Sequence, residues 1–475
     1  MMMSKINKAN LKKTIYYLKR NGLRDTFLAA LERLQKSKQE TYEYHCLSAK
    51  VLEEQRVWSK ENQQTLFSIV VPAYHTAEIH LRAMIESVLA QSYENFELVI
   101  ADAGNEVKKA EIVKSYKDSR ICYLPLRENL GISDNTNEAL QHAKGDYVGL
   151  LDHDDILTAD ALYEVAVRIN QYQKEGKKLQ LVYSDEDKCD DAGEHYFERH
   201  SKLDFNLDLI LSNNYICHFL VVKADLIKRL GFRKEFDGAQ DYDLVLRCIR
   251  DISNGYQENH DTGVSLLLPF QEKDTICHIP KVLYHWRCHK QSTAENPQSK
   301  QYAYEAGGRV IADFLSNMQI AGEVAATRHL GFYQIQYQPD MLSQRTDVGA
   351  IGGKILNSKN KITGGIYCAD GDCPYQDIYK GYSGYMHRAM LTQDAYAVDI
   401  RLMQIRPDLF DTVNEIVEKY MTSEEEQLLL DGNVLDCSRL SLDETQFRRL
   451  SMEASRRLYE LNYRVVWNPS WTKRI

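Results

Sequence analysis

The stretch GDYVGLLDHDD, residues 145–155, places several acidic side chains directly after a short apolar run. A short apolar run bounded by polar residues is typical of a buried strand. In sheets whose strands alternate with helices, ligands bind beyond the carboxyl ends of the strands. This stretch therefore predicts a strand that delivers carboxylates to the binding edge of a sheet.

The same pattern recurs on both sides of this stretch. The runs LFSIVVP (66–72), FELVIAD (96–102) and LQLVYSDED (179–187) are also apolar and are followed by polar residues or proline. Segments with helical spacing of apolar residues separate them. Strands that alternate with helices predict an α/β fold with parallel pairing through crossover connections. The first strand is followed by neither GxGxxG nor GxxxxGK[ST], which disfavours a Rossmann dehydrogenase and a P-loop enzyme.

Composition narrows the class of protein further. The 475 residues are 44% apolar and 27% charged, which excludes a disordered or fibrous chain. Acidic residues outnumber Lys and Arg by 68 to 59, a net charge of −9, so no nucleic-acid partner is expected. No apolar stretch approaches the ~20 residues of a membrane span. The ten cysteines show no zinc spacing and no secretion signal precedes them, which predicts reduced thiols in a cytoplasmic protein.

The first 38 residues are strongly basic. They contain ten Lys or Arg and two acids, Asp25 and Glu32, a local charge of 10 − 2 = +8, with apolar residues at helical spacing. One interpretation is an amphipathic helix that makes a peripheral contact with an anionic membrane, at the inner face of the plasma membrane. The other is a solvated helix packed on the next domain.

Asp152 and Asp154 are candidates for a cation site. Two carboxylates one residue apart after a strand can approach one hard cation, and Mg²⁺ or Mn²⁺ prefers oxygen ligands. The alternative is that Asp154 or Asp155 caps the following helix. The buried strand before them and the other acids at strand ends favour the cation.

Two later segments carry candidate catalytic groups. In GAQDYDLVLRCIR (238–250), Asp241 and Asp243 point to different sides of a helix, so one can enter a cleft while the other caps the helix or faces solvent. In HIPKVLYHWRCHKQST (278–293), Arg287 and His289 lie on one face if the chain is extended. An arginine can bind a diphosphate, and a histidine can bind metal or phosphate. The alternatives are that the two aspartates only complement the helix dipole and that the arginine and histidine are ordinary surface residues.

Residues 66–300 resemble the catalytic domain of glycosyltransferase family 2, which has the α/β GT-A fold. The resemblance rests on the order of the stretches SIVVPAYHT, ELVIADAG, ENLGISDNTNEAL, GDYVGLLDHDD, VYSDEDK, NYICHF, FDGAQDYDLVLR and HIPKVLYHWRCHKQST. It is similar above all to bacterial enzymes that build rhamnose-containing or other cell-surface polysaccharides.

The resemblance implies roles for residues on the donor side. Pro72, Ala73, Tyr74 and Asp102 match positions that hold the nucleotide base and ribose. Asn129 matches the asparagine of the E-N-x-G motif.

It also implies the metal and catalytic groups. Asp152 and Asp154 match the D-x-D motif, with Asp154 the direct metal ligand, and Asp241 matches the catalytic base. Arg287 and His289 match a segment that closes on the diphosphate, where His289 also reaches the metal. The family's usual acid before the base is Gln240 here, and its usual arginine before Asn137 is a threonine.

The function expected from this resemblance is metal-dependent, inverting transfer of a sugar. The donor would be a UDP- or dTDP-sugar, the cofactor Mg²⁺ or Mn²⁺, and the acceptor a growing glycan or a lipid-linked glycan. The alternative is a non-catalytic partner in a polysaccharide-assembly complex. A nucleotidyltransferase would need a basic, glycine-rich loop after the first strand, which VPAYHTAEIH lacks.

Three regions are expected along the chain: a basic helical segment (1–65), the catalytic domain (66–320) and a C-terminal α/β domain (330–475). The last resembles the acceptor half of a second, degenerate family 2 domain, in which Leu450 and Ser451 occupy the position of the base. The alternative is an ordinary α/β appendage.

Overall fold

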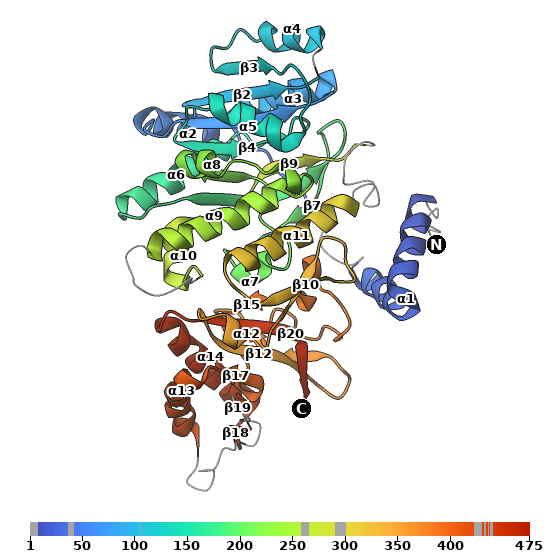
Figure 1. The fold of residues 1–475 in the computed structure, drawn as a ribbon, viewed down its shortest axis with the longest axis vertical. Helices are drawn as coiled ribbons and strands as arrows, with labels where there is room; N and C mark the ends of the chain where they lie inside the picture. The colour runs from blue at the N-terminus through green and yellow to red at the C-terminus, as the bar shows by residue number, and fades with distance from the viewer. Residues whose placement is uncertain are drawn as a thin grey trace. The chain divides into compact units, whose positions relative to one another are not determined.

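A computed structural model describes most of the chain, and its contacts divide it into two units (Figure 1). The described residues are 8–36, 42–104, 106–257, 266–289, 301–421, 430–431, 434–435, 437 and 440–475. The larger unit, which we call the sheet unit, comprises 42–206 and 213–324. The other, the C-terminal unit, comprises the N-terminal helix, residues 207–212 and residues 325–475.

The sheet unit is built on a mixed nine-stranded sheet in the order β3-β2-β1-β4-β8-β6-β9-β5, with β7 paired to β6. Its strands are β1 (Phe67–Ala73), β2 (Phe96–Asp102), β3 (Ile121–Pro125), β4 (Tyr147–Leu150), β5 (Ile156–Leu157), β6 (Leu181–Cys189), β7 (Tyr196–His200), β8 (Leu220–Lys223) and β9 (Ile276–Arg287). Its helices are α2 (Ala49–Glu61), α3 (Glu78–Leu89), α4 (Val107–Ser115), α5 (Ile132–His142), α6 (Ala161–Lys174), α8 (Ala224–Leu230), α9 (Gln240–Gln257), α10 (Pro269–Thr275) and α11 (Gln301–Asn317).

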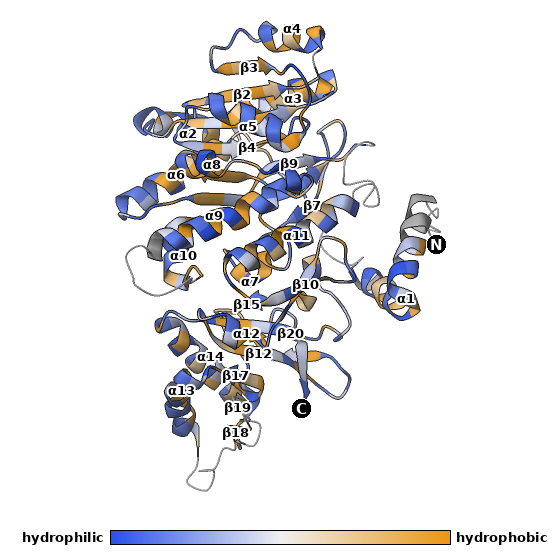
Figure 2. Ribbon diagram, viewed as in Figure 1, coloured by the Kyte–Doolittle hydropathy of each residue, from blue (hydrophilic) through white to orange (hydrophobic). Residues whose placement is uncertain are grey.

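The apolar runs form the central strands because both faces of the sheet are covered. Phe67, Ile69 and Val71 of β1 are fully buried, and so are Leu98 and Ile100 of β2. The helices bury one side only, so they mix polar and apolar residues; Figure 2 shows apolar colouring along β2 and both colours along α9. The α/β class expected from the sequence is confirmed.

The expectation of parallel pairing holds for one part of the sheet and is wrong for another. Strands β1, β2, β3 and β4 pair in parallel, as do β6 and β9. Strand β8 lies between β4 and β6 and is antiparallel to both. A parallel partner needs a long crossover, usually a helix, but an irregular segment and the four-residue helix α7 (Leu207–Ile210) precede β8.

The C-terminal unit has its own sheet and core, so the predicted C-terminal α/β region is present. Its seven-stranded sheet has the order β15-β20-β12-β17-β19-β18, with β13 on β12. Its elements are α12 (Met341–Gln344), β12 (Val348–Leu356), β13 (Ile362–Gly364), β14 (Ile366–Tyr367), β15 (Gln393–Asp394), β16 (Ala397–Val398), β17 (Met403–Ile405), α13 (Phe410–Val417), β18 (Leu430–Asp431), β19 (Val434–Leu435), α14 (Glu444–Glu460) and β20 (Arg464–Arg474). A separate pair, β10 (Gly322–Ala326) and β11 (Tyr333–Tyr337), precedes them.

Helix α1 (Lys8–Lys36) is the basic helix expected at the N-terminus, and its contacts place it in the C-terminal unit. Its backbone breaks helical geometry at Gly22, where φ is 77°. Among the helices of the described residues, none combines the length and apolar character that crossing a membrane requires.

Candidate active site

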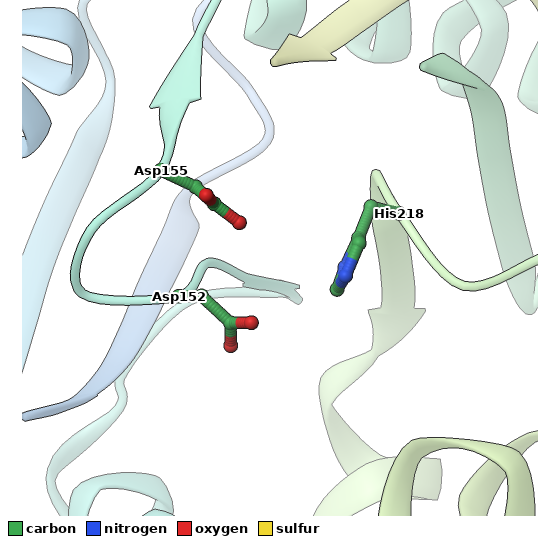
Figure 3. Close-up of side chains that lie close together, drawn as sticks. All are labelled: Asp152, Asp155 and His218. Atoms are coloured by element: carbon green, nitrogen blue, oxygen red, sulfur yellow. The ribbon is translucent and has the colours of Figure 1, made fainter. Parts of the chain in front are cut away.

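Three side chains at the carboxyl end of β4 and the start of β8 form a compact cluster. One ligand atom each from Asp152, Asp155 and His218 lies within 4.8 Å of the others. Figure 3 shows both carboxylates on the segment that leaves β4, with His218 across from them. Two carboxylates and an imidazole are a donor set that Mn²⁺ or another first-row divalent cation accepts, while Mg²⁺ favours the oxygens.

The acids of this cluster sit in an environment that opposes their ionisation. Burial raises the pKa of Asp152, and the nearby charges of Asp154 and Asp241 raise it further. Burial also raises the pKa of Asp155 well above its ordinary value. The Tyr284 hydroxyl donates to Asp155 at 2.5 Å and the Arg287 amide donates to it at 2.8 Å. A cation among these carboxylates would favour their charged forms.

Asp154 and His289, two of the residues predicted to bind metal, contact each other directly. Nε2 of His289 lies 2.7 Å from Oδ2 of Asp154. Burial works against ionisation of Asp154, but His153 and the hydrogen bond from His289 hold its pKa below the usual value. Asp154 is therefore an ionised carboxylate beside a histidine, while Asp152 faces the neighbouring cluster.

Arg287 ends β9 beside the same acids and is 1% exposed. Its Nε donates to the Asp154 carbonyl at 2.6 Å, and its Nη1 donates to the Asp191 carbonyl at 2.7 Å. Its Nη2 is buried and has no hydrogen-bond partner within the part of the chain that the structure describes. A guanidinium with an unused buried donor can bind an anionic oxygen.

The two acids at the start of α9 have different surroundings. The carboxylate of Asp241 accepts from Nδ2 of Asn214 at 2.9 Å and from Sγ of Cys217 at 3.5 Å. Asp243 is 1% exposed and is bound by the guanidinium groups of Arg233 and Arg247. Asp243 is therefore fixed in an ion-pair network, and Asp241 is the acid of the pair that is free of arginine in these contacts.

The predicted donor-side residues lie on and after β1 and β2. Pro72 and Ala73 end β1, and Tyr74 follows with 45% of its surface exposed. Asp102 ends β2 and is buried, with Oδ2 accepting from the Tyr123 hydroxyl at 2.7 Å and Oδ1 accepting from the Gly104 amide at 2.8 Å.

Asn129 is engaged in its own loop. Its Oδ1 accepts from the Gly131 amide at 3.1 Å and from Nδ2 of Asn135 at 2.9 Å. These contacts fix the turn that enters α5.

Sequence reasoning gave no role to His218 or Tyr284. His218 stacks on the Tyr284 ring, with centroids 4.5 Å apart and planes at 9°. Its loop is held by Lys202 and Glu186: Lys202 Nζ donates to the carbonyls of Ile216 and His218, and the His218 amide donates to Glu186 at 3.3 Å. His218 occurs in the stretch NYICHF, but nothing local indicates that β8 inserts beside β4.

The sequence is similar to that of known glycosyltransferases. The glycosyl transferase family 2 model matches residues 68–231. An uncharacterized glycosyltransferase of Haemophilus influenzae is 30% identical over 202 residues, which are 42% of this chain and 77% of that protein. The O-antigen biosynthesis protein RfbC of Myxococcus xanthus is 30% identical over 293 residues, 61% of this chain and 21% of that protein. The uncharacterized protein y4gI of Sinorhizobium fredii is 38% identical over 255 residues, 53% of this chain and 25% of that protein.

The family model and these relatives identify the protein as a transferase. The chain belongs to glycosyltransferase family 2 and has the GT-A fold that the sequence predicted. It spans a quarter or less of the length of the Sinorhizobium and Myxococcus relatives.

Proposed function

We propose that this glycosyltransferase moves a sugar from a UDP- or dTDP-sugar to a growing cell-surface glycan or a lipid-linked glycan, with inversion at the anomeric carbon. The observation that carries the proposal is the gathering of Asp152, Asp154, Asp241 and Arg287 near one end of the sheet. The alternative of a non-catalytic partner would not require the three carboxylates and the arginine at these positions.

A divalent cation, Mg²⁺ or Mn²⁺, fits the residues at this edge. The proposed ligands are Asp154, Asp152 and His289, and the adjacent cluster of Asp152, Asp155 and His218 offers a second donor set that shares Asp152. When bound, the cation would offset the negative charge that develops on the leaving diphosphate. The raised pKa of Asp152 supports the need for such a cation, because burial disfavours its charged form.

Asp241 is the proposed general base. An acceptor hydroxyl is a poor nucleophile until a carboxylate within hydrogen-bond reach removes its proton. Both side-chain contacts to Asp241 fall on Oδ2, so we assign proton transfer to Oδ1. A single displacement with one base needs no covalent nucleophile, and it inverts the anomeric carbon through an oxocarbenium-like transition state.

Arg287 and the ends of β1 and β2 are the proposed donor site. The unused Nη2 of Arg287 would donate to a diphosphate oxygen. Pro72, Ala73, Tyr74 and Asp102 would hold the nucleotide, with the exposed ring of Tyr74 available to cover the base. Asn129 would contribute indirectly, because its side chain holds the turn that enters α5.

The acceptor class is supported by the name of the Myxococcus relative, an O-antigen biosynthesis protein. The match covers 21% of that protein, so its name supports the class of acceptor and no particular sugar or linkage.

Residues 330–475 of the C-terminal unit are proposed to be a degenerate second domain without catalytic activity. Ser451, at the position of a base, is fully buried in α14, where its Oγ accepts from the Ile400 amide at 3.0 Å and donates to the Phe447 carbonyl at 2.7 Å. Asp370 and Asp372 are exposed acids of this unit. Substituting either by alanine should leave donor turnover unchanged. Loss of turnover in either variant would show that this region takes part in catalysis.

Donor hydrolysis by the full chain tests the proposed function. A panel of UDP- and dTDP-sugars is incubated with the protein and Mg²⁺ or Mn²⁺, with and without chelator, and release of the nucleoside diphosphate is measured. We expect metal-dependent release from one donor class, with Asp241→Asn still binding that donor. Failure of every nucleotide sugar to bind or react would favour the non-catalytic alternative.

A further inference from the structure

Helix α1 has one face bound to the rest of the C-terminal unit. Asp25 accepts from Nη1 of Arg328 at 3.2 Å. Glu32 accepts from the Ser383 and Gly384 amides at 3.0 and 2.8 Å. These acids are seven residues apart, so they lie on the same side of the helix. The bound face is therefore the acidic one.

The opposite face exposes large apolar side chains. Leu23 is 80% exposed and Phe27 is 64% exposed, and they are four residues apart, so they lie on one side of the helix. Ile15, beyond the break at Gly22, is 44% exposed. Single exposed apolar residues are ordinary, but a leucine and a phenylalanine that are mostly exposed on one turn form a surface that is suited to a partner.

The charges around this apolar pair are positive. Asp25 and Glu32 are the only acids between residues 8 and 36, and both are used on the bound face. Lys19, Arg24 and Arg33 are exposed. Docking of α1 thus engages both acids in contacts with the rest of the unit, while Arg24, next to Leu23, and Lys19 and Arg33 stay exposed.

We infer that the exposed surface of α1 binds the surface of an anionic lipid bilayer, through Leu23, Arg24 and Phe27 after the break at Gly22 and through Ile15 and Lys19 before it. Apolar side chains flanked by Lys and Arg on one side of a helix enter the boundary between headgroups and acyl chains, while the cations attract anionic lipid. A second copy of this chain fits less well, because two such cationic faces would repel each other. The inference is independent of catalysis, although it would bring the proposed enzyme close to a lipid-linked acceptor.

Vesicle sedimentation with the full chain tests this inference. The vesicles are pure phosphatidylcholine or equal parts of phosphatidylcholine and phosphatidylglycerol, at low and high salt. The variants are Leu23→Ser with Phe27→Ser, and Lys19→Glu with Arg24→Glu. The matched control is Ile79→Ser with Val107→Ser, two apolar residues of the sheet unit that are similarly exposed.

We expect the wild type and the control to bind the anionic vesicles, and salt to weaken that binding. Each α1 variant should lose about tenfold or more in its partition coefficient. Equal binding to both vesicle types, or binding that neither α1 variant changes, would overturn the inference. Light scattering gives a second readout: a wild-type dimer that Leu23→Ser with Phe27→Ser converts to a monomer would assign this face to self-association instead. Circular dichroism of each variant checks that the fold is retained.

Discussion

Asn214 donates a hydrogen bond of 2.9 Å from Nδ2 to Oδ2 of Asp241, and its own Oδ1 accepts from the Cys217 amide at 3.3 Å. The amide side chain thus links the first turn of α9 to the segment that leads into β8. The same segment carries His218, one member of the cluster with Asp152 and Asp155. One short stretch of chain therefore contacts both the proposed base and the proposed metal site.

Asn214→Ala should lower the rate of transfer by about tenfold, because a base must be held in position to accept a proton efficiently. The donor KM should change little, since Asn214 contacts the base rather than a donor-site residue. Steady-state kinetics of transfer gives both constants. Asn414→Ala is the control, because its side chain donates a hydrogen bond to the exposed Glu418, with no other side-chain hydrogen bond among the described residues. An equal fall in rate in both variants, or a change in KM without a fall in rate, would show that Asn214 does not position the base.

Asp154→Ala should weaken metal-dependent donor binding, and excess chelator should silence the wild type, because the diphosphate needs a cation among these carboxylates. Calorimetry with Mn²⁺ measures the metal affinity directly. Comparing His289→Ala with His218→Ala decides which histidine completes the site with Asp152. Full activity in excess chelator would mean that the D-x-D segment is a structural turn and does not bind a metal needed for activity.

Lys354→Met should stabilise the folded protein at neutral pH. Lys354 is 3% exposed, and burial, with the charge of Arg328 adding to it, lowers its pKa from 10.5 to about 8. The unfolded chain therefore binds one more proton between these values, so the stability of the wild type rises with pH across this range. Below pH 8 the charged amine costs about 3 kcal/mol, which methionine would remove.

Thermal unfolding from pH 7 to pH 10.5 measures this difference. The gain in Lys354→Met should shrink as pH rises. Lys361→Met, an exposed lysine of the same unit, is the control for other groups that titrate. A constant difference across this range would mean that the pKa of Lys354 is not lowered.

The strands that carry the site could be predicted from the sequence because their signal is local. The runs that became β1, β2, β4 and β6 are apolar over consecutive residues and end in polar ones, so both the strands and the position of Asp152 and Asp154 follow from a short window.

Other parts of the site depend on contacts far apart in the sequence. Nothing near His218 indicates that β8 enters the sheet antiparallel beside β4, which is what brings His218 to Asp152. Asp241 and Asp243 look alike in the sequence; Arg247, four residues further on, binds Asp243, but the Asn214 side chain that contacts Asp241 lies 27 residues away. Likewise, the spacing of Asp25 and Glu32 puts them on one side of α1, but only their contacts with Arg328 and Ser383 show that this side is the bound one.

The central claim is that Asp241 is the base of a metal-dependent glycosyl transfer, and a comparison of wild type with Asp241→Asn tests it most directly. The two side chains are nearly the same size, so the contact from Asn214 and the fold should change little. The account predicts that the single-turnover rate of transfer falls by ~10²–10⁴, while the Kd of the donor in Mn²⁺ stays within a few-fold. Near-normal transfer by Asp241→Asn with donor binding intact would contradict the account and assign the base to another residue.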